Sequence, residues 1–322
     1  MIKSAIYLIA ICLTLMGCKQ SSLPGQQIPL AKQGLLSADL SLDGKQAIVS
    51  SLSQGTVVWD LAQGKERWRW RQSDDDNDFV TLTRFSPDDS HAITATQHAF
   101  AIWRLQDGQS QGYYSLPESS LRDAALSADG RQVLIGRADG KAELVDTRSG
   151  RRLQFLGHTE QVNTVDLSAN GRYALTGGND YSAYLWDTRS GQVIWRFNHG
   201  GRVVMARLDS AGRFAFTADS RQASIWDLKT GKVLSRLRLD HRFEVHTSAR
   251  FANDGRWLIT GAPSRQLSLW QVSDGSLLQR WQVSPHPDVK PPSAVVYGVA
   301  LRDNSHLVSA SSSGLAEIWT IK

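Results

Sequence analysis

His158, Thr176 and Asp180 are the residue types of a nucleophilic catalytic triad, and they lie within one stretch, Gly157–Gly191. A threonine hydroxyl attacks a carbonyl carbon when a histidine removes its proton and a carboxylate orients that histidine. These three side chains therefore raise a hydrolase hypothesis. It requires the Thr176 hydroxyl to reach a substrate.

An acidic segment suggests a second kind of chemistry. Asp74, Asp76 and Asp78 alternate in RQSDDDNDF in the manner of the start of a calcium-binding loop. Phe79 stands where such a loop needs its glycine, and Phe85 stands where it needs its bidentate glutamate. The segment therefore predicts a solvated acidic loop and no metal site. The rest of the chain shows no nucleophile elbow, no glycine-rich phosphate loop and no Cys/His cluster with metal spacing.

The elements around the first three residues read as strands. The stretch contains the short apolar runs VNTVDLS, RYALTG and SAYLWD, separated by turn residues at Ala-Asn-Gly, Gly-Asn-Asp and Arg-Ser-Gly, and the run QVIWRF follows. The pattern predicts one four-stranded antiparallel sheet. A single sheet of this size is not stable alone, so it needs copies of itself on both sides.

Those copies recur along the chain. The reference position is Trp59, Trp103, Val145, Trp186, Trp226, Trp270 and Trp319, at steps of 44, 42, 41, 40, 44 and 49 residues. The turn after the first strand recurs as SLDGK, SPDDS, SADGR, SANGR, DSAGR, ANDGR and RDNSH. Such a period predicts seven sheets in one ring, with no room for a second folded domain.

Gly157-His158, Asp180 and the pair Trp186-Asp187 resemble a complete WD repeat, and the other six repeats keep its skeleton. The resemblance implies an all-β, seven-bladed β-propeller of four-stranded antiparallel blades over residues 26–322. It also implies that His158, Thr176, Asp180 and Trp186 form the buried hydrogen-bonded tetrad of this family. The Thr176 hydroxyl is then a relay inside a blade, and we expect neither an enzyme nor a cofactor.

Two other repeats depart from that tetrad. The third keeps Asp139 but has Val145 and Pro117 at other tetrad positions. The fifth keeps His199, Thr217 and Trp226 but has Ser220 at the aspartate position. We expect these two blades to depend more on packing.

The chain opens with a short positive start, an apolar run over residues 4–16 and the sequence Leu-Met-Gly-Cys ending at Cys18. This ending resembles the bacterial lipobox. It implies a signal peptide over 1–17, lipidation of Cys18 and a tether over 18–25; the alternative is an uncleaved membrane anchor. Because Lys19 is not the aspartate associated with inner-membrane retention, the analogy favours the outer membrane, facing the periplasm.

The run QIPLAKQ after the tether resembles the runs that close each blade. The seventh repeat ends without such a run. We therefore expect the N-terminal strand to complete the last blade, which removes an exposed sheet edge.

The innermost strands place charged residues at one level, where the seven blades carry Asp39, Arg84, Ala125, Asp166, Arg207, Arg250 and Ala300. Opposite charges fall on adjacent blades twice, Asp39 beside Arg84 and Asp166 beside Arg207. This predicts a structural belt of ion pairs between neighbouring blades. The alternative is that Arg250, with no acid beside it, holds an anion in the channel.

The surface predicts a membrane-tethered, monomeric scaffold that binds a protein or peptide on one face of the ring. The resemblance implies that the loops entering the innermost strands lie on that face, the top face. The candidate contacts there are Arg137, Asn179, Arg202, Arg221, Arg242 and Arg265, opposite the acidic loop Asp74, Asp75, Asp76 and Asp78.

The alternatives are a propeller-type enzyme acting at the channel mouth and a binder of an anionic envelope component. A net charge of +5 is too small and dispersed along the chain to predict nucleic-acid binding.

Overall fold

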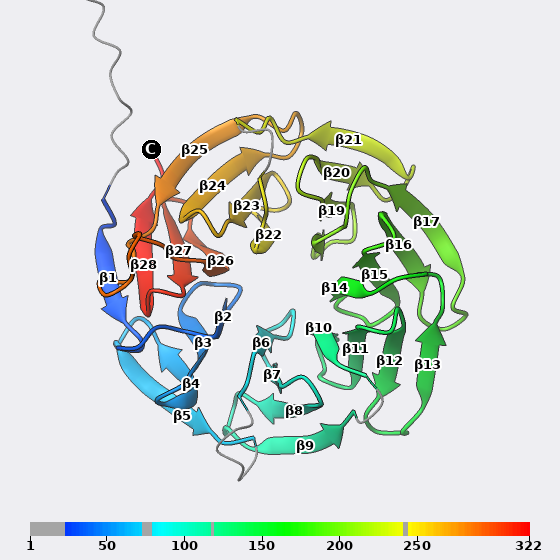
Figure 1. The fold of residues 1–322 in the computed structure, drawn as a ribbon, viewed down its shortest axis with the longest axis horizontal. Helices are drawn as coiled ribbons and strands as arrows, with labels where there is room; N and C mark the ends of the chain where they lie inside the picture. The colour runs from blue at the N-terminus through cyan, green and yellow to red at the C-terminus, as the bar shows by residue number, and fades with distance from the viewer. Residues whose placement is uncertain (1–22, 73–78, 117–118, 241–243) are drawn as a thin grey trace, which may run out of the picture.

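A computed structural model describes residues 23–72, 79–116, 119–240 and 244–322. It arranges 28 strands as seven four-stranded antiparallel sheets around a central channel (Figure 1). This confirms the predicted all-β, seven-bladed β-propeller. No helix in the described ranges is long and apolar enough to cross a membrane.

The strands follow the repeats, and we number the blades in chain order. Blade one comprises β2 (Ser37–Leu40), β3 (Gln46–Ser51), β4 (Gly55–Asp60) and β5 (Lys65–Trp70). Blade two comprises β6 (Leu82–Phe85), β7 (His91–Ala95), β8 (Ala99–Arg104) and β9 (Ser110–Ser115). Blade three comprises β10 (Leu121–Leu126), β11 (Gln132–Arg137), β12 (Ala142–Asp146) and β13 (Arg152–Phe155).

The remaining blades repeat this order. Blade four comprises β14 (Val162–Leu167), β15 (Tyr173–Gly178), β16 (Ser182–Asp187) and β17 (Val193–Asn198). Blade five comprises β18 (Met205–Leu208), β19 (Phe214–Ala218), β20 (Ala223–Asp227) and β21 (Lys232–Arg236). Blade six comprises β22 (Ser248–Ala252), β23 (Trp257–Gly261), β24 (Gln266–Gln271) and β25 (Leu277–Gln282). Blade seven comprises β26 (Val296–Asp303), β27 (His306–Ser311), β28 (Leu315–Thr320) and β1 (Gln26–Pro29).

The turn after the first strand of a blade is held by a side chain. Ser168 donates its hydroxyl proton to the side-chain oxygen of Asn170 at 2.8 Å and accepts the backbone N–H of Tyr173 at 2.9 Å. Gly171, between them, has a φ of 69°, which a glycine adopts without strain. The equivalent serines Ser41, Ser86 and Ser127 make the same pair of bonds. The recurring turn sequence therefore forms the same type of turn in these blades.

The hydrophobic core lies between neighbouring blades. The Trp103 ring stacks on Trp70 of the preceding blade with centroids 4.8 Å apart, and Trp186 stacks on Phe155 at the same distance. Trp226 likewise stacks on Phe197 at 4.4 Å. Each of these tryptophans therefore covers the outer strand of the blade before it, so each repeat needs a neighbouring repeat to bury its hydrophobic side chains.

The N-terminal strand closes the ring, as predicted. β1 pairs antiparallel with β28, from Gln26 opposite Ile318 to Pro29 opposite Leu315, and Figure 1 shows it outside β28 in the last blade. Glu317 of β28 is fully buried and accepts a hydrogen bond from the Gln27 side chain at 2.9 Å and one from the Ser284 backbone at 3.1 Å. One carboxylate thus joins the closing strand to the segment that enters blade seven.

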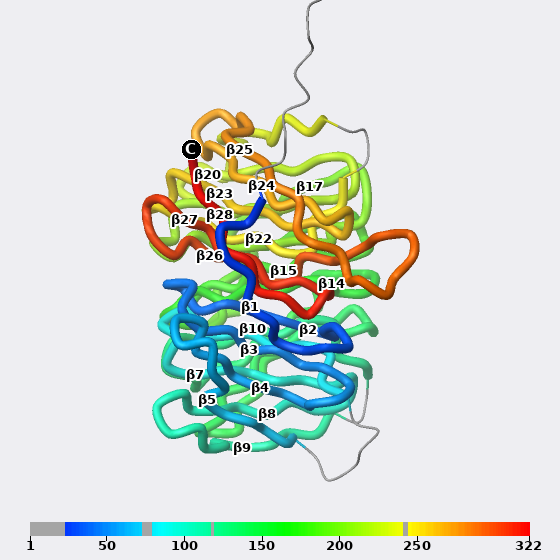
Figure 2. Tube along the Cα trace, turned by 90° about the vertical axis from the view of Figure 1, so that its left-hand side faces the viewer, coloured from blue at the N-terminus to red at the C-terminus, as the bar shows by residue number. Residues whose placement is uncertain are grey.

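The ring has two unlike faces. We call the face with the turns after the first and third strands of each blade the bottom face, and the opposite face, where the chain enters each innermost strand, the top face. In Figure 2 the loop between β25 and β26, drawn in orange, projects to the right on the top face, and the C-terminus lies to the left on the bottom face.

Glu317→Ala should destabilise the fold by about 2 kcal/mol or more, because the Gln27 amide and the Ser284 N–H lose a buried acceptor. Glu317→Gln, which keeps an acceptor oxygen, should lose less. Urea unfolding measures both, with Glu66→Ala on the outer wall of blade one as the control. Equal loss at positions 317 and 66 would show that the carboxylate does not secure the closure.

Candidate functional site

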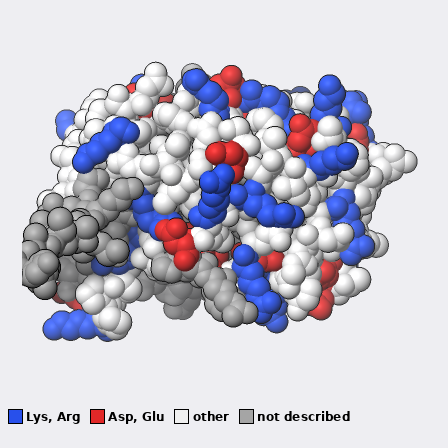
Figure 3. Space-filling view, turned by 90° about the horizontal axis from the view of Figure 1, so that it is seen from above, with Lys and Arg blue, Asp and Glu red and all other residues white. Residues whose placement is uncertain are grey.

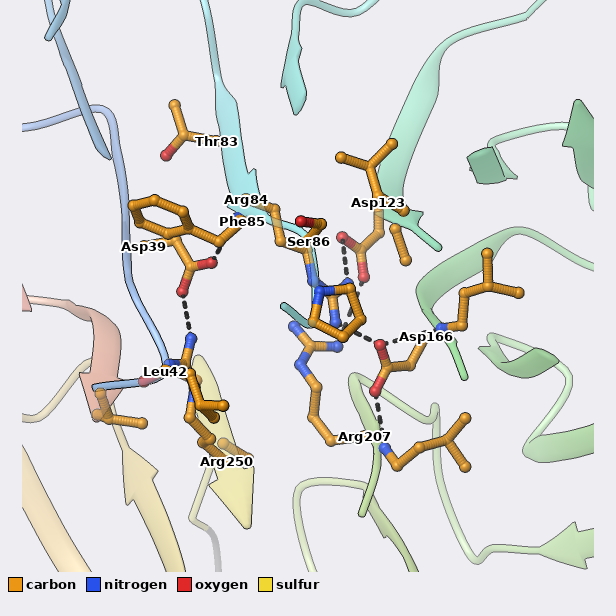
Figure 4. Close-up of a pocket in the computed structure, with 18 of the residues that line it drawn as sticks. Asp39, Leu42, Thr83, Arg84, Phe85, Ser86, Asp123, Asp166, Arg207 and Arg250 are labelled. Carbon is orange, nitrogen blue, oxygen red and sulfur yellow. Dashed lines mark hydrogen bonds and ion pairs between the residues drawn. The ribbon is translucent and has the colours of Figure 1, made fainter. Parts of the chain in front are cut away.

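The innermost strands enclose a cavity of about 290 Å³ along the central channel. Its wall carries the predicted level of charged residues, and Asp123 of β10 joins them (Figure 4). This wall carries three acidic and three basic side chains at about this level, Asp39, Asp123, Asp166, Arg84, Arg207 and Arg250. Whether a side chain of the channel can bind a ligand therefore depends on whether it already pairs with an opposite charge.

The two closest ion pairs join blades that are not neighbours, so the predicted pairs Asp39–Arg84 and Asp166–Arg207 were wrong. The Arg84 guanidinium of blade two contacts the Asp166 carboxylate of blade four at 2.6 Å, and Arg250 of blade six contacts Asp39 of blade one at 2.9 Å (Figure 4). In each case the blade between them carries alanine at this level, Ala125 or Ala300. The small side chain leaves space for a long arginine to cross.

The aspartates do contact the neighbouring blade, but through its backbone. Asp39 accepts the N–H of Phe85 at 2.9 Å, and Asp166 accepts the N–H of Leu208 at 2.7 Å. Asp123 accepts the N–H of Val165 at 2.8 Å. Each of these carboxylates therefore fastens two other blades, which is a structural role.

Arg250 contacts the Asp39 carboxylate, which corrects the premise that no acid stands near it. Besides Asp39 it donates to the carbonyl oxygens of Ser41 at 2.9 Å and Leu40 at 2.7 Å. Arg207 is the more weakly paired guanidinium, since its closest carboxylate oxygen, on Asp123, is 3.7 Å away. Burial, together with the charge of Arg84, lowers the pKa of Arg207.

The predicted tetrad residues of blade four meet in the structure. His158 Nδ1 lies 3.0 Å from Asp180 Oδ1, and His158 Nε2 lies 2.9 Å from Thr176 Oγ1. Burial alone would raise the pKa of Asp180, but the hydrogen bond and charge of His158, together with the backbone N–H groups of Thr159 and Ser182, lower that pKa. The indole N–H of Trp186 has no hydrogen-bond partner among the described residues, so the expected chain of bonds stops at the threonine.

Blade five holds a similar chain, with an aspartate that the sequence reading missed. The Trp226 indole donates to Thr217 Oγ1 at 2.7 Å, and His199 Nε2 lies 2.8 Å from the same oxygen. His199 Nδ1 is 3.5 Å from Asp219, so Asp219 and not Ser220 stands beside the histidine. The turn after Thr217 reaches its acid two residues later instead of four, which shifts the aspartate out of the expected register.

Both threonines are fully buried, and their hydroxyls are bonded within the blade. A hydroxyl enclosed in this way cannot attack a substrate. The arrangement therefore gives no support to the hydrolase hypothesis. The described residues also contain no group of three His, Cys, Asp or Glu side chains placed to hold a metal ion.

The candidate contacts of the top face do not all reach its surface. Arg202 and Arg221 are exposed. Asn179 is half-buried and accepts a bond from Asn163 at 2.8 Å, and half-buried Arg265 donates to the Val283 carbonyl at 2.8 Å. Arg202 and Arg221 are therefore the side chains of this set that a partner reaches most directly.

Arg137 was wrongly placed among these contacts. It is 3% exposed and pairs with Glu143 at 3.0 Å and Asp139 at 3.1 Å. This buried pair occupies blade three, the blade that has Val145 in place of the tryptophan. Three other predicted features, Cys18, Arg242 and the acidic loop Asp74, Asp75, Asp76 and Asp78, lie outside the described residues, as does Pro117.

Comparison with known proteins agrees with this geometry. A profile described as "WD domain, G-beta repeat" matches residues 150–187, which include β14, β15 and β16 of the tetrad blade. The comparisons support the WD-repeat propeller family.

Three relatives share a part of the chain. Autophagy-related protein 16 of Arabidopsis thaliana is 28% identical over 41% of this chain and 26% of its own length. WD repeat-containing protein SL1-17 of Schistosoma mansoni is 29% identical over 41% of this chain and 43% of its own. Small ribosomal subunit protein RACK1 of Drosophila melanogaster is 24% identical over 39% of this chain and 53% of its own. The chain therefore spans between about a quarter and about half of these relatives' lengths.

The sequence reading of this propeller overlooked two side chains. Tyr181 follows the tetrad aspartate, is 51% exposed and has a φ of 62°, which bulky residues rarely adopt. His246 is 2% exposed, and burial lowers its pKa to about 4. A signal for His246 was present, because the other six blades carry an aliphatic residue at its position, four residues before the charged level.

Arg84→Met should destabilise the propeller by about 3–5 kcal/mol, because it leaves the Asp166 carboxylate partly buried without its cation. Arg207→Met should cost clearly less, because no carboxylate lies in close contact with that guanidinium. Guanidinium chloride unfolding of both variants gives the comparison. The double variant Arg84→Met with Asp166→Asn should recover part of the loss. Equal effects at positions 84 and 207 would contradict the pairing across the channel.

Proposed function

We propose that this chain is a membrane-tethered WD-repeat scaffold that binds a protein or peptide partner on the top face of blades four and five. The observation that carries the proposal is the exposure of the Tyr181 ring together with that of two arginines on adjoining loops, Arg202 and Arg221. Tyrosine and arginine are the residue types that most often dominate the energy of protein–protein interfaces.

These three side chains come from loops that contact one another. The Tyr181 carbonyl accepts the N–H of His199 at 2.9 Å, which fixes the loop carrying Arg202 against the turn of blade four. Gly201 of this loop lies against the Asp219 side chain, and Asp219 accepts the N–H of Arg221 at 2.6 Å. The three loops therefore form one connected surface on a rigid support, which limits the ordering that a partner must impose.

The buried charges of the channel support a scaffold over an enzyme at the channel mouth. Asp39, Asp123 and Asp166 each accept a backbone N–H of the next blade, and Asp39 and Asp166 also contact an arginine. A general acid or base needs a proton that it can exchange with a substrate. One relative is named as a protein of the small ribosomal subunit, and a component role of this kind fits the proposal.

The membrane part of the proposal rests on the sequence. The sequence assigns the lipid to Cys18. It places the protein in the cell envelope, with the outer membrane as the first choice. β1 begins at Gln26, opposite Ile318 near the end of β28 that leads to the bottom face. Eight residues extend over at most roughly 28 Å, so a lipid at Cys18 would hold the bottom face towards the bilayer and leave the top face free.

A photo-crosslinking side chain at position 181 should capture a discrete partner in membranes of the source cell. Tyr173 provides the matched control, because it is an exposed tyrosine of the same blade on the bottom face. Arg202→Glu with Arg221→Glu should remove the adduct at 181 while the melting temperature stays unchanged. The same adduct from position 173, or an adduct that survives both reversals, would contradict the proposed face.

A further inference from the structure

We propose that the bottom edge of blades three, four and five is a docking surface for an anionic lipid bilayer. The surface consists of residues 147–151, 188–192 and 228–232, which are three consecutive turns between the third and fourth strands, the last including the first residue of β21, and we call it the basic arc. The inference deepens the proposed function, on which it rests for the bilayer, by naming the part of the ring that meets the membrane.

The basic arc concentrates exposed cations. It carries Arg148, Arg151, Arg189, Lys229 and Lys232, all of them exposed. None of these five side chains forms an ion pair with another described residue. The corresponding turns of blades two and six read QDGQ and SDGS, so they carry an aspartate and no cation.

The acids of the same edge are occupied by their own turns. Asp187 accepts the backbone N–H of Arg189 at 2.8 Å, which lowers the pKa of Asp187, and it also contacts Arg172 at 3.1 Å. Asp146 contacts Arg131 at 2.8 Å in the same way. In blade five Asp227 accepts the N–H of Thr230. These paired acids leave the outward cations of the arc in excess.

The three turns lie side by side and are fastened to one another. Arg151 of blade three reaches the Arg189 carbonyl of blade four at 3.5 Å. Trp195 of blade four donates its indole N–H to the Leu228 carbonyl of blade five at 2.9 Å, and its ring covers Gly231 so closely that a side chain there would collide with it. The cations therefore sit on a fixed surface and not on independent loops.

Apolar side chains accompany the cations. Val193 and Ile194, at the start of β17, are 47% and 38% exposed, and Tyr173 is 36% exposed beneath the Arg172 guanidinium. The outer wall over β21 and β25 shows Lys and Arg side chains in excess, with Asp and Glu side chains interspersed among them (Figure 3). Cations with interleaved aliphatic and tyrosine side chains suit the interface of an anionic bilayer, where phosphate groups lie above the acyl chains. A nucleic acid would gain little from the aliphatic groups.

The test uses residues 19–322, because all 28 strands and both partners of the closing pair lie within them. Binding is measured by sedimentation with vesicles of phosphatidylcholine alone and of phosphatidylcholine with phosphatidylglycerol, at low salt and at high salt. The arc variant is Arg148→Glu, Arg189→Glu and Lys229→Glu. The control variant, Lys45→Glu, Lys65→Glu and Arg256→Glu, makes the same change of charge on the bottom turns of blades one and six.

The unchanged chain should bind the anionic vesicles and not the neutral ones, with an affinity that falls as salt rises. Each cation near an anionic surface contributes roughly fivefold, so the arc variant should lose about a hundredfold in partition coefficient. The control variant should lose far less.

Equal losses in the two variants, or binding of duplex DNA or inorganic phosphate in preference to the anionic vesicles, would overturn the proposal. The outcome is separable from that of the partner-binding face. Vesicle binding that persists without a crosslinked partner at position 181 would reject that face and leave the basic arc standing.

Discussion

Ring closure is the constraint on which this structure depends. No blade buries both faces of its sheet by itself, because the tryptophan of one blade stacks on the outer strand of the blade before it. The seventh blade would end in an open edge without β1, and the strand that fills the gap is held through the buried Glu317 carboxylate. The aspartates of the channel add a second closure, since each accepts a backbone N–H of the next blade. Each blade therefore depends on contacts with the blades beside it.

The sequence was sufficient for the architecture, because a turn at a fixed period and a recurring tryptophan are local marks that each repeat carries on its own. It identified the level of the charged residues in the channel but not their partners. An arginine reaches its partner across the blade that carries alanine, and this contact arises only when the ring is closed, so no single repeat predicts it. The same limit hid Asp219, which a shorter turn brings beside His199, and the burial of Arg137 against Glu143.

The distribution of charge separates the structural charges of the channel from the surfaces that we propose for binding. Inside the channel, the arginines and aspartates largely neutralise one another. Outside, Arg202 and Arg221 accompany Tyr181 on the top face, and the basic arc lies at the bottom edge. The cations of the arc are about 40 residues apart from blade to blade, so the sequence reading described them as dispersed. The ring brings them together because equivalent turns of adjacent blades are neighbours in space.

The central claim is that the bottom edge of blades three to five faces the bilayer while the top face of blades four and five stays free for a partner. The most direct test places an environment-sensitive fluorophore at Ser190 in the basic arc or at position 181 on the top face. The lipid-anchored chain is then held on anionic vesicles whose headgroups carry a nitroxide quencher. The account predicts strong quenching at position 190 and little at position 181. Stronger quenching at position 181, or equal quenching at both, would contradict it.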